Sequence, residues 1–346
     1  MTLASRVAPR ASQIATRIAV LSMHTSPLAP LGGAATGGMN VYIHEVSERL
    51  ATPGRAIDVF TRRESPDAPA IVEFAPGARL IQIEAGPAEP LPKTSLIELT
   101  DDFAAGIEAF RAAEAISYDL VHSHYWLSAV AGEKLVERWG IPHIAMFHTL
   151  GEVKLRARAS EHEPPERLQA ERQLVHSLDR VVAATDYEQR LLRQIYGVPR
   201  SNVDVIPLGV DPERFHPGPQ EVARATLGIA DDAQVVLAVG RIEPLKGLDI
   251  LIRAAAQVTE RSRLQLLIVG GDEAARPEFE RLAAIAEEVG VRDLVSFVGA
   301  VGHDELPEYY RASDVVVMPS FSESFGLVAV EAMASGVPVV VSRVGG

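Results

Sequence analysis

Short runs of consecutive apolar residues alternate with longer segments of mixed polarity along most of the chain, starting near Arg17. The apolar runs are rich in valine, isoleucine and leucine, which is typical of strands buried on both faces of a parallel sheet. The segments between them have the length and the apolar spacing expected of helices. Because strands that alternate with helices form parallel sheets covered by helices, we predict an α/β protein with doubly wound, Rossmann-like sheets.

The predicted strands form two groups along the chain. In the first half they cover residues 17–23, 56–62, 78–85, 120–124, 142–149, 180–185 and 203–207. Helices between these strands are predicted over residues 39–51, 126–139, 165–177 and 187–195. Strands of the second half are predicted over residues 234–241, 264–271, 295–300, 314–320 and 338–344.

The segment 208–220 interrupts the alternation with three prolines and no periodicity, so we predict a linker there. A first domain would then cover residues 17–207 and a second domain residues 221–346, with residues 1–16 as a disordered tail. The sequence ends directly after an apolar strand and a Gly-Gly turn. A doubly wound domain normally continues beyond such a point, so the second domain is expected to be incomplete.

Composition narrows the classes of function. A chain of 346 residues exceeds one compact core, which agrees with two domains. It contains no cysteine, which excludes disulfides, thiolate chemistry and cysteine-ligated zinc. The formal charge of -13 disfavours nonspecific binding to nucleic acid. No stretch is apolar and long enough to span a bilayer, so we expect no integral membrane segment and a cytoplasmic location.

The segment SFSESFGLVAVEAMASG places Glu323 in a loop after a predicted strand and Glu331 in the helix that follows. That helix opens at Gly326-Leu327. A helix N-terminus offers free N–H groups and a positive dipole end, which suits a diphosphate, and a glycine lets the ligand approach closely. Glu331 is either a solvated surface carboxylate or a partner for a ribose diol, and the segment alone leaves both open.

A second segment, VGRIEPLKG, ends a predicted strand at Gly240-Arg241 and places Lys246 five residues further on. Two cations and a glycine at the carboxyl end of a parallel strand suit an anionic ligand, although a solvated loop is the alternative. Arg241 and Glu323 each follow a strand of the same domain, so both are expected to face one crevice.

Two weaker signals lie in the first half. Gly37 and Gly38 end a glycine-rich loop after the first strand, where backbone N–H groups could contact a phosphate. His122, His124 and His148 follow apolar strands. They lie on separate strands with no i, i+4 pair on a helix, so hydroxyl-binding or structural roles are favoured over a metal site.

From Arg17 onward the chain resembles the family 4 retaining glycosyltransferases of GT-B fold. The segments that carry the resemblance occur in order and at family-like spacing: GGMNVY, HSHYWLS, FHTLGEVK, IPLGVD, VGRIEPLKG, IVGG, YYRASDVVVMPSFSESFGLVAVEAMASGVPVV and SRVGG. Within the family, the first half is most similar to the enzymes of mycothiol synthesis that join N-acetylglucosamine from UDP to inositol phosphate. Leu127 and Asn40 favour that branch over the sucrose-phosphate synthases, which are next most similar.

The resemblance implies roles for individual residues. In the donor site, the diphosphate would be met by Gly37, Gly38, Arg241, Lys246, Gly326 and Leu327, the ribose by Glu331, and the hexose by Glu323 and His148. In the acceptor site, a phosphorylated polyol or sugar would be held by Asn40, Lys93, Tyr125, Thr149 and Arg167. The nucleotide sugar is a co-substrate, and the resemblance implies no cofactor and no metal.

Other functions remain open on the sequence alone. The same donor site would serve a sucrose-phosphate synthase or a transferase acting on glycolipid or polysaccharide. A catalytically inactive module that binds nucleotide sugars is an alternative of another class. A nicotinamide oxidoreductase fits poorly, because the GxGxxG fingerprint and its acidic partner are lacking. The oligomeric state is open, with a homodimer as one option.

Overall fold

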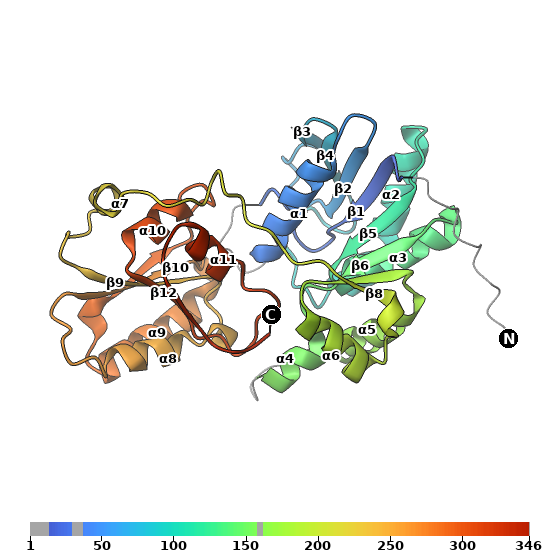
Figure 1. The fold of residues 1–346 in the computed structure, drawn as a ribbon. Coiled ribbons are helices and arrows are strands. Elements are labelled where there is room, and N and C mark those ends of the chain that lie inside the picture. The colour runs from blue at the N-terminus through green and yellow to red at the C-terminus, as the bar shows by residue number, and fades with distance from the viewer. Residues whose placement is uncertain (1–13, 30–36, 158–161, 346) are drawn as a thin grey trace.

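Two parallel sheets with helices around them make up the described part of the chain, which is residues 14–29, 37–157 and 162–345 of a computed structural model. They form two lobes side by side (Figure 1). Most of the predicted tail and residues 30–36 of the glycine-rich loop lie outside the described residues.

The first lobe contains an eight-stranded sheet in the order β3-β4-β2-β1-β5-β6-β7-β8. Its strands are β1 (Arg17–Leu21), β2 (Ala56–Arg62), β3 (Ile71–Ala75), β4 (Ala78–Ile83), β5 (Leu120–His124), β6 (His143–Met146), β7 (Arg180–Ala183) and β8 (Val203–Val205). Its helices are α1 (Gly38–Leu50), α2 (Thr100–Ala113), α3 (Tyr125–Trp139), α4 (Gly151–Ala157), α5 (Pro165–Ser177) and α6 (Asp186–Tyr196).

The second lobe contains a five-stranded parallel sheet in the order β11-β10-β9-β12-β13. Its strands are β9 (Gln234–Val239), β10 (Leu264–Val269), β11 (Val295–Gly299), β12 (Val315–Met318) and β13 (Val339–Val341). Its helices are α7 (Gln220–Leu227), α8 (Leu248–Ala255), α9 (Arg276–Glu288), α10 (Leu306–Ala312) and α11 (Leu327–Ala334).

Alternate residues of the central strands face opposite cores. In β1, Ile18 and Val20 belong to the cluster that packs against α1, whereas Ala19 and Leu21 belong to the cluster that includes α2 and α3. Burial on both faces explains why these strands appear as continuous apolar runs in the sequence. The predicted class of two Rossmann-like parallel-sheet lobes is confirmed.

The sequence analysis missed strand β3, which pairs antiparallel to β4 at the edge of the first sheet. Most of its residues are exposed or half-buried, so it lacks the apolar run that marks the other strands. The turn to β4 passes through Gly77, whose φ of 81° favours glycine. An edge strand of this kind carries no strong hydrophobic signal.

Helix α3 lies very close to the sheet at Gly132. A Cβ atom there would come within 2.6 Å of both His143 Nε2 and Ser123 Oγ, which hydrogen-bond to each other at 2.8 Å. All three residues are buried. The absence of a side chain at Gly132 therefore sets the distance between α3 and strands β5 and β6.

We predict that Gly132→Ala lowers the free energy of unfolding by about 1–3 kcal/mol, because the added methyl group pushes α3 away from the sheet. The better helix propensity of alanine offsets part of this cost. Urea unfolding followed by circular dichroism measures the effect. Glu137→Ala on the exposed side of α3 is the control and should change stability by less than about 0.5 kcal/mol. Equal stability of both variants would contradict the close-packing argument.

Candidate active site

Two loops that follow neighbouring strands of the second sheet meet at the edge facing the first lobe. One follows β9 and carries Arg241 and Lys246, and the other follows β12 and carries Glu323. A backbone hydrogen bond of 2.8 Å from Phe321 N to Leu245 O holds the loops side by side. Strands β9 and β12 are paired in the sheet, so their carboxyl ends are adjacent.

Within this site Lys246 and Glu323 form an ion pair, with 2.6 Å between Nζ and Oε1. Ser320 Oγ donates to the same carboxylate oxygen at 2.7 Å. Arg241 pairs with Glu243 at 2.9 Å. Each predicted cation of the donor site thus contacts a carboxylate of the protein, and the predicted hexose ligand Glu323 is one of those carboxylates.

Helix α11 begins at this edge with its first N–H groups uncapped by any side chain. Its N-cap residue, Gly326, has a φ of 88°, a conformation that favours glycine. Leu327 and Val328, in the first turn, line a cavity that also includes Arg241 and Glu331. The predicted helix start therefore faces the same space as one of the predicted cations.

The first lobe contributes Gly37 and Gly38 to that cavity. A Cβ atom at Gly37 would lie 3.7 Å from Arg241 Nε, and one at Gly38 would lie 3.3 Å from Leu327 Cδ1. The glycine turn and the second lobe are thus in close contact. The cavity measures about 100 Å³. This is below the roughly 300–1,000 Å³ of typical ligand pockets, so a nucleotide sugar needs the lobes to move apart before it enters.

Asn40 is buried and holds the glycine turn in place. Its Oδ1 accepts a hydrogen bond from Gly37 N at 3.0 Å. Its Nδ2 donates to Thr25 Oγ1 and to Ser26 O, both at 2.7 Å. The structure thus gives Asn40 a positioning task, and its contact with the acceptor stays a prediction.

Glu331 lies inside the second lobe, and its position excludes the solvated alternative, because only 5% of its surface is exposed. Its Oε2 accepts a hydrogen bond of 2.7 Å from Tyr310 Oη, and its Oε1 lies 3.1 Å from His303 Nε2. Burial raises the pKa of Tyr310 well above its usual value, so the hydroxyl stays protonated and donates. The sequence analysis named neither His303 nor Tyr310 as a site residue.

Three of the predicted acceptor residues lie together in the first lobe. Arg167, in α5, donates from Nη2 to Thr149 O at 2.8 Å and to Thr149 Oγ1 at 3.1 Å. Its guanidinium carbon lies 4.8 Å from the centroid of the Tyr125 ring. Arg167 is buried and pairs with Glu163 and Glu171, each at 2.7 Å. Its charge is therefore largely compensated within the protein.

Lys93 lies within the electrostatic reach of the same cations. Burial, together with the charges of Arg241, Lys154 and Arg167 and against the opposite effect of Glu243, lowers its pKa to about 8. Lys93 comes from the connection before α2, and Arg241 comes from the other lobe. Lys93 thus lies in a half-buried place near cations of both lobes, and these cations are themselves paired with Glu243, Glu163 and Glu171.

The three predicted histidines are buried and lie next to one another in the first lobe. His124 Nδ1 and His148 Nε2 are 2.9 Å apart, and the His122 and His124 rings are 4.2 Å apart. Burial lowers the pKa of His122 to about 4 and that of His148 to about 3, so both are neutral at pH 7. Across the part of the chain that the structure describes, no cluster of three or more potential metal ligands occurs.

Tyr125 and His148 have positive φ values of 73° and 60°, which are uncommon for side chains of this size. Both follow strands of the first sheet at the edge facing the second lobe. Ser324 Oγ, from the second lobe, donates a hydrogen bond to His148 O. Backbone strain of this kind, which costs of order 1–3 kcal/mol per residue, is typical of functional sites.

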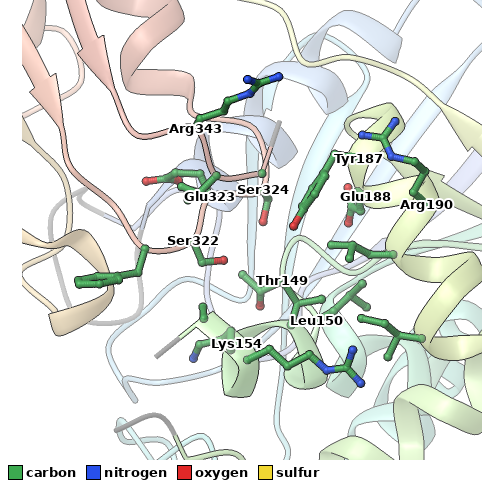
Figure 2. Close-up of a pocket in the computed structure, with 18 residues that line it drawn as sticks. Thr149, Leu150, Lys154, Tyr187, Glu188, Arg190, Ser322, Glu323, Ser324 and Arg343 are labelled. Atoms are coloured by element: carbon green, nitrogen blue, oxygen red, sulfur yellow. The ribbon is translucent and has the colours of Figure 1, made fainter. Parts of the chain in front are cut away.

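A larger cavity of about 410 Å³ lies between the lobes next to this contact. Thr149 and Lys154 line it from the first lobe, and Glu323, Ser324 and Arg343 line it from the second (Figure 2). The predicted acceptor residue Thr149 and the predicted hexose ligand Glu323 therefore share one cavity. Asn40, Lys93, Tyr125 and Arg167 are not among the residues that line either cavity, and the assigned roles stay predictions.

Comparison with known proteins identifies the family. The profile described as Glycosyltransferase Family 4 matches residues 36–214, and the profile described as Glycosyl transferases group 1 matches residues 219–346. The chain belongs to glycosyltransferase family 4. The predicted enzyme class, a glycosyltransferase that uses a nucleotide sugar, is confirmed.

Curated relatives of this glycosyltransferase include D-inositol 3-phosphate glycosyltransferases. The protein from Geodermatophilus obscurus is 46% identical over 353 residues, which cover 99% of this chain and 78% of the relative. D-inositol 3-phosphate glycosyltransferase 2 from Catenulispora acidiphila is 45% identical over 339 residues, which cover 95% of this chain and 79% of the relative.

Solved structures confirm the GT-B fold. Sucrose-phosphate synthase from Thermosynechococcus elongatus superposes with a TM-score of 0.88 at 36% identity, over 96% of this chain and 82% of that chain. Anabaena HepE in complex with UDP and glucose has a TM-score of 0.73 over 96% of this chain and 82% of that chain. At 22% identity the second likeness shows the fold alone. None of the helices that the structure describes has the length and hydropathy needed to cross a membrane.

We predict that Lys93→Met stabilises the protein at pH 7 by of order 1–3 kcal/mol, because the substitution removes a charge that is disfavoured chiefly by its burial. The pKa of Lys93 is lower in the folded chain than its usual 10.5, so the cost of this charge is complete below about pH 8. The cost decreases as the pH rises from there towards 10.5.

Urea unfolding at pH 7 and at pH 9.5 tests this prediction, and the stability gap between Lys93→Met and the wild type should narrow at the higher pH. Lys134→Met, which removes a lysine paired with Asp101 at 2.6 Å on the outer side of the first lobe, is the control. A Lys93→Met variant less stable than the wild type at pH 7 would refute the argument.

Proposed function

We propose that this enzyme transfers a hexosyl group from a UDP-sugar to inositol phosphate with retention of configuration at the anomeric carbon. The observation that carries the proposal is the placement of Arg241, Lys246 and the start of α11 against a first-lobe cluster of Lys93, Arg167 and Thr149. The identity of 43–46% with D-inositol 3-phosphate glycosyltransferases over nearly the whole chain supports the acceptor. The HepE structures contain UDP and UDP-glucose, and they support UDP as the nucleotide of the donor only through the shared fold.

Departure of the nucleoside diphosphate creates negative charge, and the second lobe is built to receive it. Arg241, Lys246 and the free N–H groups of α11 supply preorganised positive charge, which is commonly the largest catalytic contribution of an enzyme. The donor diphosphate would replace the carboxylates of Glu243 and Glu323 as the partners of these cations. Glu323, once released from Lys246, would be free to accept hydrogen bonds from hexose hydroxyls.

Retention requires the acceptor oxygen to attack from the face that the leaving group vacates. The bond between the anomeric carbon and the phosphate oxygen breaks, and a bond from the same carbon to the acceptor oxygen forms. The acceptor proton passes to an oxygen of the leaving diphosphate, so the reaction needs no base from the protein and no metal ion. His148 would lie against the hexose as a neutral imidazole.

The acceptor phosphate would bind beside Lys93. Arg167 already pairs with Glu163 and Glu171, so it would orient the phosphate site more than add net charge to it. The charge of Lys93 is disfavoured chiefly by burial, and a bound phosphate would supply it with a partner. Thr149 and Tyr125 complete the predicted phosphate site, held in place by Arg167.

A second candidate is transfer to a sugar phosphate, as in the sucrose-phosphate synthase that superposes well on this chain. It would use the same donor site and the same cluster of cations.

Three further predictions are not tested by the structure: the domain limits at residues 207 and 221, the cytoplasmic location and a homodimer. An inactive nucleotide-sugar-binding module stays the alternative outside the transferases.

We predict that the enzyme forms a glycosylated inositol phosphate when UDP-N-acetylglucosamine and D-inositol 3-phosphate are supplied. Mass spectrometry and anomeric NMR of the product, with UDP-glucose, GDP-mannose and fructose 6-phosphate as competing substrates, measure this. An α-linked product formed fastest from the first pair is expected. Transfer to the sugar phosphate in preference to inositol phosphate would contradict the proposed acceptor, and binding of UDP without any transfer would favour the inactive module.

We predict that Arg241→Ala lowers kcat by about two to three orders of magnitude, because it removes one charged contact to the leaving diphosphate. Steady-state kinetics with saturating donor measures the effect. Arg253→Ala is the matched control, since this arginine lies in α8 and pairs with Glu288 on the surface. Unchanged turnover of Arg241→Ala would refute its assignment.

A further inference from the structure

Arg214 lies between the two lobes, where three separate segments meet. Its Nη1 is 2.9 Å from Glu45 Oε1, in α1 of the first lobe, and 3.0 Å from His303 Nδ1, in the loop after β11. Its Nε is 3.1 Å from Asp304 Oδ1. The arginine therefore contacts the first lobe and the second lobe with one planar group.

The contact with Arg214 determines which nitrogen of His303 carries the proton. A guanidinium can only donate hydrogen bonds, so His303 Nδ1 must accept. The proton of the neutral ring is then on Nε2, which faces Glu331 Oε1 at 3.1 Å and donates to it. Phe215, whose ring centroid is 5.1 Å from that of His303, restrains the plane of the imidazole.

Glu331 retains capacity for a ligand despite its two protein donors. A carboxylate offers about four lone-pair sites, and Tyr310 and His303 occupy one on each oxygen. The remaining sites suffice for the two hydroxyls of a ribose. Because Glu331 and His303 line the same cavity as Gly37 and Gly38, the open side of the carboxylate faces the proposed nucleotide site.

We infer that Arg214 and His303 are positioning residues for ribose recognition, in which Arg214 fixes the tautomer of His303 and His303 orients Glu331. The inference rests on the proposed function, because it takes the ribose diol as the ligand of Glu331. It assigns a task to two residues that the transferase chemistry does not otherwise use. Arg214 itself contacts no atom of the substrates in this scheme.

The link to Glu45 extends the arrangement to the first lobe. Glu45 belongs to α1, the helix that begins at Gly38 and thus at the glycine turn of the donor site. Arg214 therefore connects the helix of the first lobe with the side chain that orients Glu331.

The test compares the binding of UDP with that of 2′,3′-dideoxy-UDP, which lacks the ribose diol. The ratio of the two Kd values reports the contact made by Glu331, whereas a general structural defect weakens both ligands equally. In the wild type we expect the dideoxy nucleotide to bind roughly tenfold more weakly or worse, since it leaves a charged hydrogen-bonding group unpaired. Glu331→Gln should reduce this ratio to near one.

Arg214→Met and His303→Asn should lower the ratio by roughly two- to tenfold and leave the Kd of the dideoxy nucleotide unchanged. His303→Asn keeps an acceptor for Arg214 but cannot reach Glu331. His303→Gln keeps an N–H near the position of Nε2, so it should recover part of the ratio. Isothermal titration calorimetry measures each value, and the two His303 variants alone carry the test if Arg214→Met fails to fold.

Arg49→Met is the matched control. Arg49 pairs with the same Glu45 and lies 3.4 Å from Asp211 of the linker, but it does not contact His303. The ratio of the two Kd values for Arg49→Met should equal that of the wild type. If Glu331→Gln loses the discrimination while the Arg214 and His303 variants keep it, the positioning inference is overturned and the proposed function stands. If the wild-type protein binds UDP and 2′,3′-dideoxy-UDP with equal Kd values, the assignment of Glu331 to the ribose is overturned together with the positioning inference.

Discussion

The cleft of this protein depends on carboxylates that compensate the charges of its lysine and arginine side chains. Lysine and arginine side chains that are partly removed from water need partners, since an uncompensated charge in such a place costs several kcal/mol. In the absence of substrate the chain supplies its own anions: Glu323 holds Lys246, and Glu243 holds Arg241. Both pairs lie within the second lobe, so each cation that we propose for the diphosphate is compensated by a carboxylate of its own lobe.

Lys93 and Arg167, which we propose as parts of the acceptor site, differ in how their charges are compensated. Arg167 is buried with two glutamates and is fixed by contacts to Thr149 and Tyr125. The pKa of Lys93 is lowered chiefly by burial, so a bound anion would stabilise its charged form. The strained backbones of Tyr125 and His148 lie at the same edge.

The fold could be predicted from the sequence, and so could the proximity of Arg241, Lys246 and Glu323, because both follow from strands buried on two faces. Such strands produce clear apolar runs, and the residues after them converge at one edge of the sheet. The same rule indicates His303, which follows β11. The burial of Asn40 and the pairing of Arg167 with Glu171 could not be predicted from the sequence, since they depend on how loops and helices pack. Edge strand β3 was missed because its residues are mostly exposed.

The contact between Gly37 of the first lobe and Arg241 of the second limits which lobes can be exchanged between related enzymes. Neither lobe alone carries the whole of the donor site that we propose, because the glycine turn and the cations belong to different lobes. A chimera that takes its first lobe from a relative with another acceptor would therefore exchange part of the donor site too. Only those pairs whose glycine turn and α1 contacts match the incoming second lobe should yield a working hybrid.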